Sequence, residues 1–69
     1  MAGVRVFVNG KALECEPGAT ALDAVAQADR KEAEEVHSGR RMIVDSRGIA
    51  VSPYEPVFAG AIFRTLRQR

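Results

Sequence analysis

The sequence predicts an α+β fold, in which a mixed sheet of four or five strands packs one main helix against one face. Three observations support this prediction. Valines alternate over residues 4–8, an Asn9-Gly10 pair follows them, and the main helical pattern begins after Pro17-Gly18. Asn-Gly between apolar runs is a strong hairpin signal. A hairpin, a helix and then further strands indicate a two-layer domain.

The length of 69 residues suits one domain, spanning residues 1–69. A chain this short buries only about 60% of the surface that its unfolded form exposes, which leaves no room for a deep cleft. Ten basic and nine acidic side chains give a net charge of +1, which is not the footprint of a nucleic-acid-binding protein as a whole. A single cysteine cannot close an intramolecular disulfide, so we expect a cytoplasmic location. We expect no membrane contact, because the sequence has neither a signal peptide nor an apolar run of ~20 residues.

The first two strands are predicted over residues 4–8 and 11–16. Period-two alternation of β-branched residues favours a strand, and it places Val4, Val6 and Val8 on one face. Leu13 and Cys15 continue this face in the second strand. The ribbon therefore offers one apolar side that a helix can cover.

The helical region begins with a capping pattern. Thr20 lies three residues before Asp23, a spacing that lets the hydroxyl and the carboxylate each accept a backbone N–H. Asp29 with Glu32 repeats the pattern, which predicts a break in the helix near Asp29. A single helix over residues 20–38 is the alternative.

Three more strands are predicted over residues 41–45, 49–51 and 61–67. The fourth is expected at a sheet edge, because Pro53 ends it. If the last strand lies beside the first, the two run parallel. Residues 53–60 are expected to be irregular, with Tyr54, Val57 and Phe58 turned inward.

Alternation also assigns side chains to the two faces of the sheet. Facing the helix we expect Val4, Val6, Val8, Leu13, Cys15, Met42, Val44 and Phe63. The opposite face then carries a set that we call the predicted contact surface: Arg5, Phe7, Arg41, Ile43, Ile62, Arg64 and Leu66. Large apolar residues framed by arginine are typical of protein interfaces. We therefore expect this surface to bind a protein partner or to pair two copies as a homodimer.

Two residues with reactive side chains do not indicate an enzyme. Cys15 lies on the predicted core face between Glu14 and Glu16, which would raise its pKa, whereas a reactive thiolate needs a nearby cation. His37 suits the C-terminal end of a helix. One histidine and one cysteine far apart in the chain cannot assemble a metal-ligand set. We expect no catalytic residue, no metal site and no cofactor.

Three segments carry a resemblance to a known family. They are residues 6–11, 17–25 and 55–63, with the sequences VFVNGK, PGATALDAV and EPVFAGAIF. Their order and spacing resemble the ubiquitin-like β-grasp superfamily, and within it the small sulfur carriers of thiamine and molybdopterin synthesis and the TGS domains. The resemblance implies a β-grasp fold whose open sheet face binds partners.

The resemblance also implies the alternatives for function. Sulfur carriers end in Gly-Gly, whereas this sequence ends in LRQR and contains no Gly-Gly pair. The primary expectation is therefore a non-enzymatic ubiquitin-like interaction module. The alternatives are a sulfur-carrier-like protein that lacks the terminal thiocarboxylate, or a TGS-like module associated with nucleic acid. Arg67 and Arg69 are the candidate basic contacts, for an acidic protein surface or a phosphate backbone.

Overall fold

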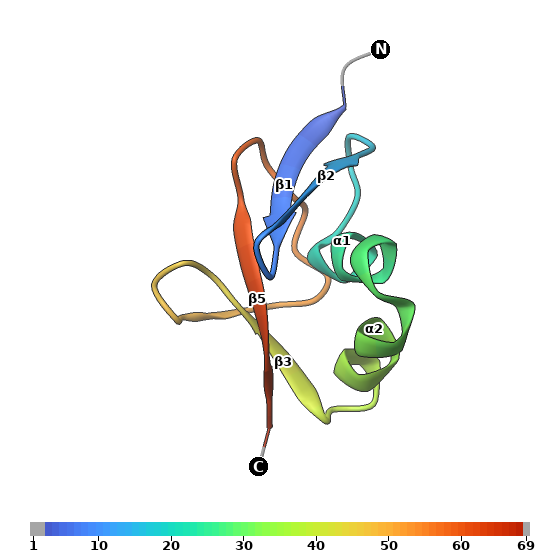
Figure 1. Cartoon of the computed structure of the whole chain (residues 1–69), viewed down its shortest axis with the longest axis vertical. Helices are drawn as coiled ribbons and strands as arrows, with labels where there is room; N and C mark the ends of the chain where they lie inside the picture. The colour runs from blue at the N-terminus through green and yellow to red at the C-terminus, as the bar shows by residue number, and fades with distance from the viewer. Residues whose placement is uncertain (1–2, 69) are drawn as a thin grey trace.

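The computed structural model describes residues 3–68, which form a five-stranded mixed sheet with two helices on one of its faces (Figure 1). In chain order the elements are β1 (Val4–Val8), β2 (Lys11–Cys15), α1 (Ala21–Ala28), α2 (Arg30–His37), β3 (Arg41–Val44), β4 (Ala50–Val51) and β5 (Ile62–Arg67). The strand order is β2-β1-β5-β3-β4. β1 and β5 run parallel, and the other neighbouring pairs run antiparallel. The predicted α+β class and mixed sheet are confirmed.

The hairpin between β1 and β2 turns at Asn9 and Gly10. Their φ angles are 52° and 85°, in the left-handed region that these two residue types tolerate. Because both angles are positive, the turn matches the twist of the flanking strands. The resulting register sets Val4 opposite Cys15 and Val6 opposite Leu13, so the predicted hairpin and its apolar side are confirmed.

The helical region is broken at Asp29, and the expectation of one main helix is wrong. Thr20 and Asp23 form the predicted capping box at the start of α1, with hydrogen bonds of 3.1 and 3.0 Å. Asp29 has an extended backbone, and its carboxylate accepts the N–H groups of Lys31 and Glu32 at 3.0 and 3.3 Å. Asp29 therefore ends α1 through its extended backbone and starts α2 through its side chain, and the break lies where the capping pattern predicted it.

The core lies between the sheet and the two helices. The largest fully buried side chains are Val6 and Val8 of β1, Val25 of α1 and Ile43 of β3. Small residues line the helix faces that meet them: Ala21, Ala24 and Ala33 are all buried. Alanine lets a helix approach the sheet closely, which suits a domain with few large apolar residues.

A polar cluster ties the first turn to α2 and β5. The Asn9 amide nitrogen donates to Glu32 at 3.0 Å and to the Thr65 hydroxyl oxygen at 3.1 Å. The Thr65 hydroxyl donates to the same Glu32 oxygen at 2.7 Å, and the Thr65 N–H donates to the Asn9 side-chain oxygen at 3.1 Å. The buried Thr65 is therefore fully paired, as a polar group in a core must be.

The face assignment predicted for β3 is wrong by one residue. Ile43 is only 1% exposed and belongs to the core, whereas it was expected on the open side. Arg41 also points toward the helices, since its guanidinium pairs with Glu35 of α2. The run Met42-Ile43-Val44 is apolar throughout, so alternation could not choose a face. The pairing of Ile43 with Thr65 of β5 decides it.

The segment between β4 and β5 also departs from expectation. Tyr54 and Phe58 are 67% and 66% exposed rather than turned inward, and only Val57 packs against the core. The carbonyl groups of Pro53 and Glu55 accept the N–H groups of Leu22 and Ala21, each at 2.8 Å. This segment therefore satisfies backbone donors at the start of α1. Its backbone position follows from these bonds, so Tyr54 and Phe58 are not drawn into the core.

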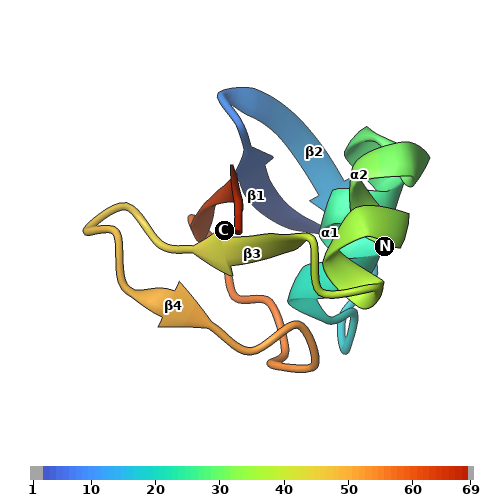
Figure 2. The ribbon, with the colours of Figure 1, turned by 90° about the horizontal axis from the view of Figure 1, so that it is seen from below.

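β4 is one of the two edge strands of the sheet, and its edge position was predicted. It spans only Ala50–Val51 and pairs with β3 alone. Figure 2 shows the turn between β3 and β4 extending away from the helices. A short edge strand offers few unpaired backbone groups to another chain, which limits edge-to-edge association.

Candidate functional site

The candidate site is the face of the sheet that points away from the helices, which we call the open sheet face. Residues paired in register share a face, so the pairings that include Phe7, Arg64 and Leu66 define it. It comprises Arg5, Phe7, Ala12, Glu14, Met42, Val44, Ala50, Ile62, Arg64 and Leu66.

The pairings arrange the apolar side chains of this face in two rows. In the first row Phe7 lies between Ala12 and Ile62, which are its partners on β2 and β5. In the second row Leu66 of β5 lies beside Met42 of β3. Along β5 the two rows are therefore separated by a single outward residue, Arg64.

The exposed apolar area of this face is concentrated on β5, the central strand. Ile62 and Leu66 are 44% and 43% exposed, whereas Phe7 and Met42 are half-buried. Val44 also belongs to this face but is only 3% exposed. Its register neighbours are Arg64 and Ala50, so little of it is offered to a partner. The accessible surface is thus Ile62 and Leu66 with Arg64 between them.

The two arginines of this face differ in what lies beside them. Arg5 lies opposite Glu14 in register, so a carboxylate is next to it. Arg64 lies opposite the apolar Val44. Within residues 3–68 the ion pair that the structure contains is Arg41–Glu35, on the other side of the sheet. Among the described residues, Arg64 therefore has neither an ion-pair partner nor a carboxylate opposite it in register, and it lies between the two apolar rows.

The structure brings together most of the predicted contact surface, but not all of it. Five of its residues lie on the open sheet face: Arg5, Phe7, Ile62, Arg64 and Leu66. Arg41 and Ile43 do not, because they face the helices. Met42 replaces Ile43, and only the register between β3 and β5 reveals the exchange. Arg67 lies opposite Arg41 on the helix side, and Arg69 lies outside the described residues.

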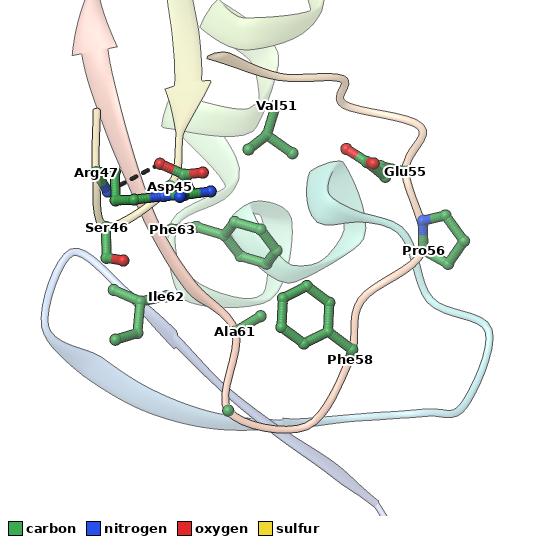
Figure 3. A pocket seen from close by; sticks show the side chains of 11 residues that line it. Asp45, Ser46, Arg47, Val51, Glu55, Pro56, Phe58, Ala61, Ile62 and Phe63 are labelled. Carbon is green, nitrogen blue, oxygen red and sulfur yellow. Dashed lines mark hydrogen bonds between the residues drawn. The ribbon is translucent and has the colours of Figure 1, made fainter. Parts of the chain in front are cut away.

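A pocket of about 390 Å³ adjoins one end of the open sheet face (Figure 3). It lies between the start of β5, the turn after β3 and the segment that precedes β5. The apolar part of its lining consists of Val51, Phe58, Ile62 and Phe63. Charged residues, including Arg47, also line it. Ile62 belongs to both the pocket and the open sheet face. Ile62 therefore connects the apolar part of the pocket with the open sheet face.

The turn that borders this pocket is held by Asp45. Its carboxylate accepts the N–H groups of Arg47 and Ile49 at 2.8 and 3.0 Å. The hydrogen bond from Ile49, followed by that from Arg47, holds the pKa of Asp45 below its usual value. A carboxylate engaged in this way has a structural role in the turn.

The residues considered for reactivity have structural positions. Cys15 is buried as predicted, and burial, followed by the charge of Asp23, raises the pKa of its thiol. The raised pKa was expected from the neighbouring Glu14 and Glu16, and that expected cause is wrong. His37 lies in the last turn of α2. Among residues 3–68 no His, Cys, Asp and Glu side chains gather as a group of three that could hold a metal ion. Neither helix in this part of the chain is long and apolar enough to cross a membrane.

A scan of the chain against protein-family models found no match, and a search of the curated proteins found none either.

Proposed function

We propose that this chain is a β-grasp domain that works as a non-enzymatic protein-interaction module, with the open sheet face as its contact surface. Two features of the architecture support the β-grasp part of the proposal. The first and last strands lie side by side and parallel at the centre of the sheet. The two helices lie between the first hairpin and β3 in the chain, on one face of the sheet. This is the arrangement that the resemblance to β-grasp proteins implies.

The observation that carries the functional part is the exposure of the central strand. A residue at the middle of a sheet has neighbours on both sides, so large side chains there are readily covered. Ile62 and Leu66 are nevertheless more than 40% exposed, on either side of the unpaired Arg64. A contiguous apolar patch rimmed by polar residues is typical of an interaction site.

The side chains of the open sheet face indicate which residue types a partner would present to it. The two apolar rows suit aliphatic or aromatic side chains, and Arg64 suits a carboxylate placed between them. The neighbouring pocket suits one bulky apolar side chain, because Phe58 and Phe63 line it. An apolar anchor in a pocket is the common form of an interface hot spot. The partner surface is therefore apolar with at least one acidic residue.

The experiment is affinity capture from native lysate with three forms of the chain, followed by quantitative mass spectrometry. Ile62→Asp places a charge on the open sheet face. Ile49→Asp makes the same change at a residue of similar exposure (54%) that lies outside that face. We expect a partner that binds the wild type and Ile49→Asp but is lost by Ile62→Asp. The captured protein is then purified and titrated against all three forms.

The proposal fails if Ile62→Asp and Leu66→Asp both retain every captured protein while their circular dichroism spectra match that of the wild type. In that case the open sheet face is ordinary surface. Loss of binding counts as support only for a variant that keeps the native spectrum, since an unfolded chain binds nothing specifically.

A further inference from the structure

A basic pocket lies at the other end of the molecule, on the helix side of the sheet. It occupies the corner where α2 ends, β3 begins and β5 ends, near the C-terminus in Figure 1. Its volume is about 170 Å³, and its lining consists of Glu35, Arg40, Arg41, Arg67 and Gln68. It shares no residue with the open sheet face, so it is an independent feature of the chain.

The fold brings three guanidinium groups to this pocket from separate segments. Arg41 of β3 and Arg67 of β5 are direct cross-strand partners, and both face the helices. Arg40 precedes β3, and two backbone hydrogen bonds hold it in place. Its N–H donates to the Glu35 carbonyl, and its carbonyl accepts the N–H of Gln68, each at 2.8 Å. These contacts hold the three arginines near one another.

One carboxylate, Glu35, lies in the lining beside these arginines, and Glu32 and Asp29 act on Arg41 from outside the lining. Glu35 accepts a hydrogen bond from Nε of Arg41, and the pair forms the ion pair described above. The pKa of Glu35 lies below its usual value, first because of that hydrogen bond and also because of nearby cations that include Arg67. The lining therefore carries three positive charges and one negative charge, a formal excess of two. The negative end of the α2 dipole offsets about half a charge of this excess, and Glu32 and Asp29 reduce it further at Arg41.

The Arg41 cation is stabilised by Glu35, Glu32 and Asp29, which raise its pKa, but it also has a like charge as its cross-strand partner. Like charges directly opposite on neighbouring strands destabilise a sheet, and Arg41 and Arg67 are such a pair. Arg41 uses Nε toward Glu35, which leaves its two terminal nitrogens able to donate. The arrangement thus offers donors in the fork geometry that binds tetrahedral oxoanions, together with a charge excess that an anion would relieve.

We propose that this pocket binds a phosphate monoester group. A monoester carries about −1.5 to −2 charges at neutral pH, close to the excess in the lining, whereas each diester of a nucleic-acid backbone carries one. The small volume of the pocket suits a single tetrahedral group. A phosphorylated side chain and a small phosphorylated metabolite present the same chemistry.

The test is a titration of the isotopically labelled whole chain with inorganic phosphate and with O-phosphoserine, at constant ionic strength set by sodium chloride. Backbone amide shifts are followed by NMR. We expect saturable shifts centred on Arg40, Arg41, Arg67 and Gln68. Removing one of several nearby charges at a solvated site changes such an affinity by roughly fivefold.

Four variants distinguish specific phosphate binding in this pocket from nonspecific attraction to positive charge. We expect Arg40→Gln and Arg67→Gln each to weaken phosphate binding by roughly fivefold, since each removes one charge from the pocket. Glu35→Gln removes the competing carboxylate and should tighten binding by a similar factor. Arg5→Gln makes the same charge change on the open sheet face and should leave the affinity unchanged.

The proposal is overturned if the shifts spread over the arginines of both faces without saturating, or if Arg5→Gln weakens binding as much as Arg67→Gln. It is also overturned if an oligonucleotide without terminal phosphate binds with a strong salt dependence while phosphate and phosphoserine do not compete. That result would make the corner a nucleic-acid contact. If phosphoserine binds and inorganic phosphate competes with it, the monoester site is supported. Tighter binding of O-phosphoserine than of inorganic phosphate then favours a phosphorylated side chain as the source, whereas equal binding favours a small phosphorylated metabolite.

Discussion

Met42 and Ile43 are adjacent, apolar and similar in size, yet the sheet places them on opposite faces. Ile43 is fully buried in the core, whereas Met42 is half-buried on the open sheet face. A run of three apolar residues carries no alternation from which a face could be predicted. Only the long-range pairing with Thr65 and Leu66 distinguishes the two positions, and pairing at this sequence separation is not visible in local patterns.

A pair of truncations tests this placement. Ile43→Ala should lower the free energy of unfolding by about 2–5 kcal/mol, because it leaves a cavity in a closed core. Met42→Ala should cost no more than about 1 kcal/mol, since its side chain is partly in water in the native state. Urea unfolding followed by circular dichroism measures both values. Equal costs, or a larger cost for Met42→Ala, would contradict the observed register.

The short elements of this chain are defined by local chemistry, and these parts were predictable. Asn9-Gly10 specifies its turn through φ, and Thr20 and Asp29 specify helix starts through their side-chain oxygens. Each signal acts within four residues and needs no tertiary contact.

The segment around Tyr54 and Phe58 is different, because its course depends on hydrogen bonds to the distant start of α1. The candidate site shows the same division. Its β1 and β5 residues were predicted, and its β3 residues were not.

The boundary between α1 and α2 yields a prediction at this scale. Asp29→Ala removes the side-chain acceptor of two N–H groups at the start of α2. We expect it to lower the free energy of unfolding by about 1 kcal/mol, the usual cost of losing an N-terminal cap. Glu34→Ala, at an exposed position within α2, is the matched control and should change stability by less than about 0.5 kcal/mol.

Hydrogen exchange locates the effect of the cap. In Asp29→Ala the amides of the first turn of α2 should exchange faster than those of α1, because the loss is confined to one helix end. Two results would contradict this prediction: Asp29→Ala is as stable as the wild type, or both helices lose protection equally. Either result would show that the Asp29 side chain does not stabilise the start of α2 as a separate helix.

At the scale of the whole molecule, the chain separates two kinds of surface. The open sheet face is apolar and carries Arg64, which forms no ion pair within residues 3–68, whereas the corner beyond α2 is basic because three arginines line it. The sheet lies between them, so one partner could occupy each without competition. The net charge of +1 conceals this division, because the acidic residues of α2 lie on the helix side of the sheet, where Glu35 pairs with Arg41, and not on the open sheet face.

The open sheet face raises the question of self-association. A standard interface buries about 800 Å² per partner, a large share of the 4714 Å² that this chain exposes. A two-fold pairing through the face would bring together two copies of Arg64, and the carboxylate nearest to the face centre, Glu14, already lies beside Arg5. Burying unpaired charges is costly, so the face is better matched to an acidic partner than to itself.

We therefore expect a monomer of 7.5 kDa over the micromolar range, measured by sedimentation equilibrium. Its mass should not change in Ile62→Asp, because no contact is lost. Low salt should favour the monomer further, since Arg64 side chains then repel more strongly. A doubled mass in the wild type that reverts to the monomer in Ile62→Asp would show that the face binds a second copy. In that case the two apolar rows serve a homodimer, and the search for an acidic partner at Arg64 should be abandoned.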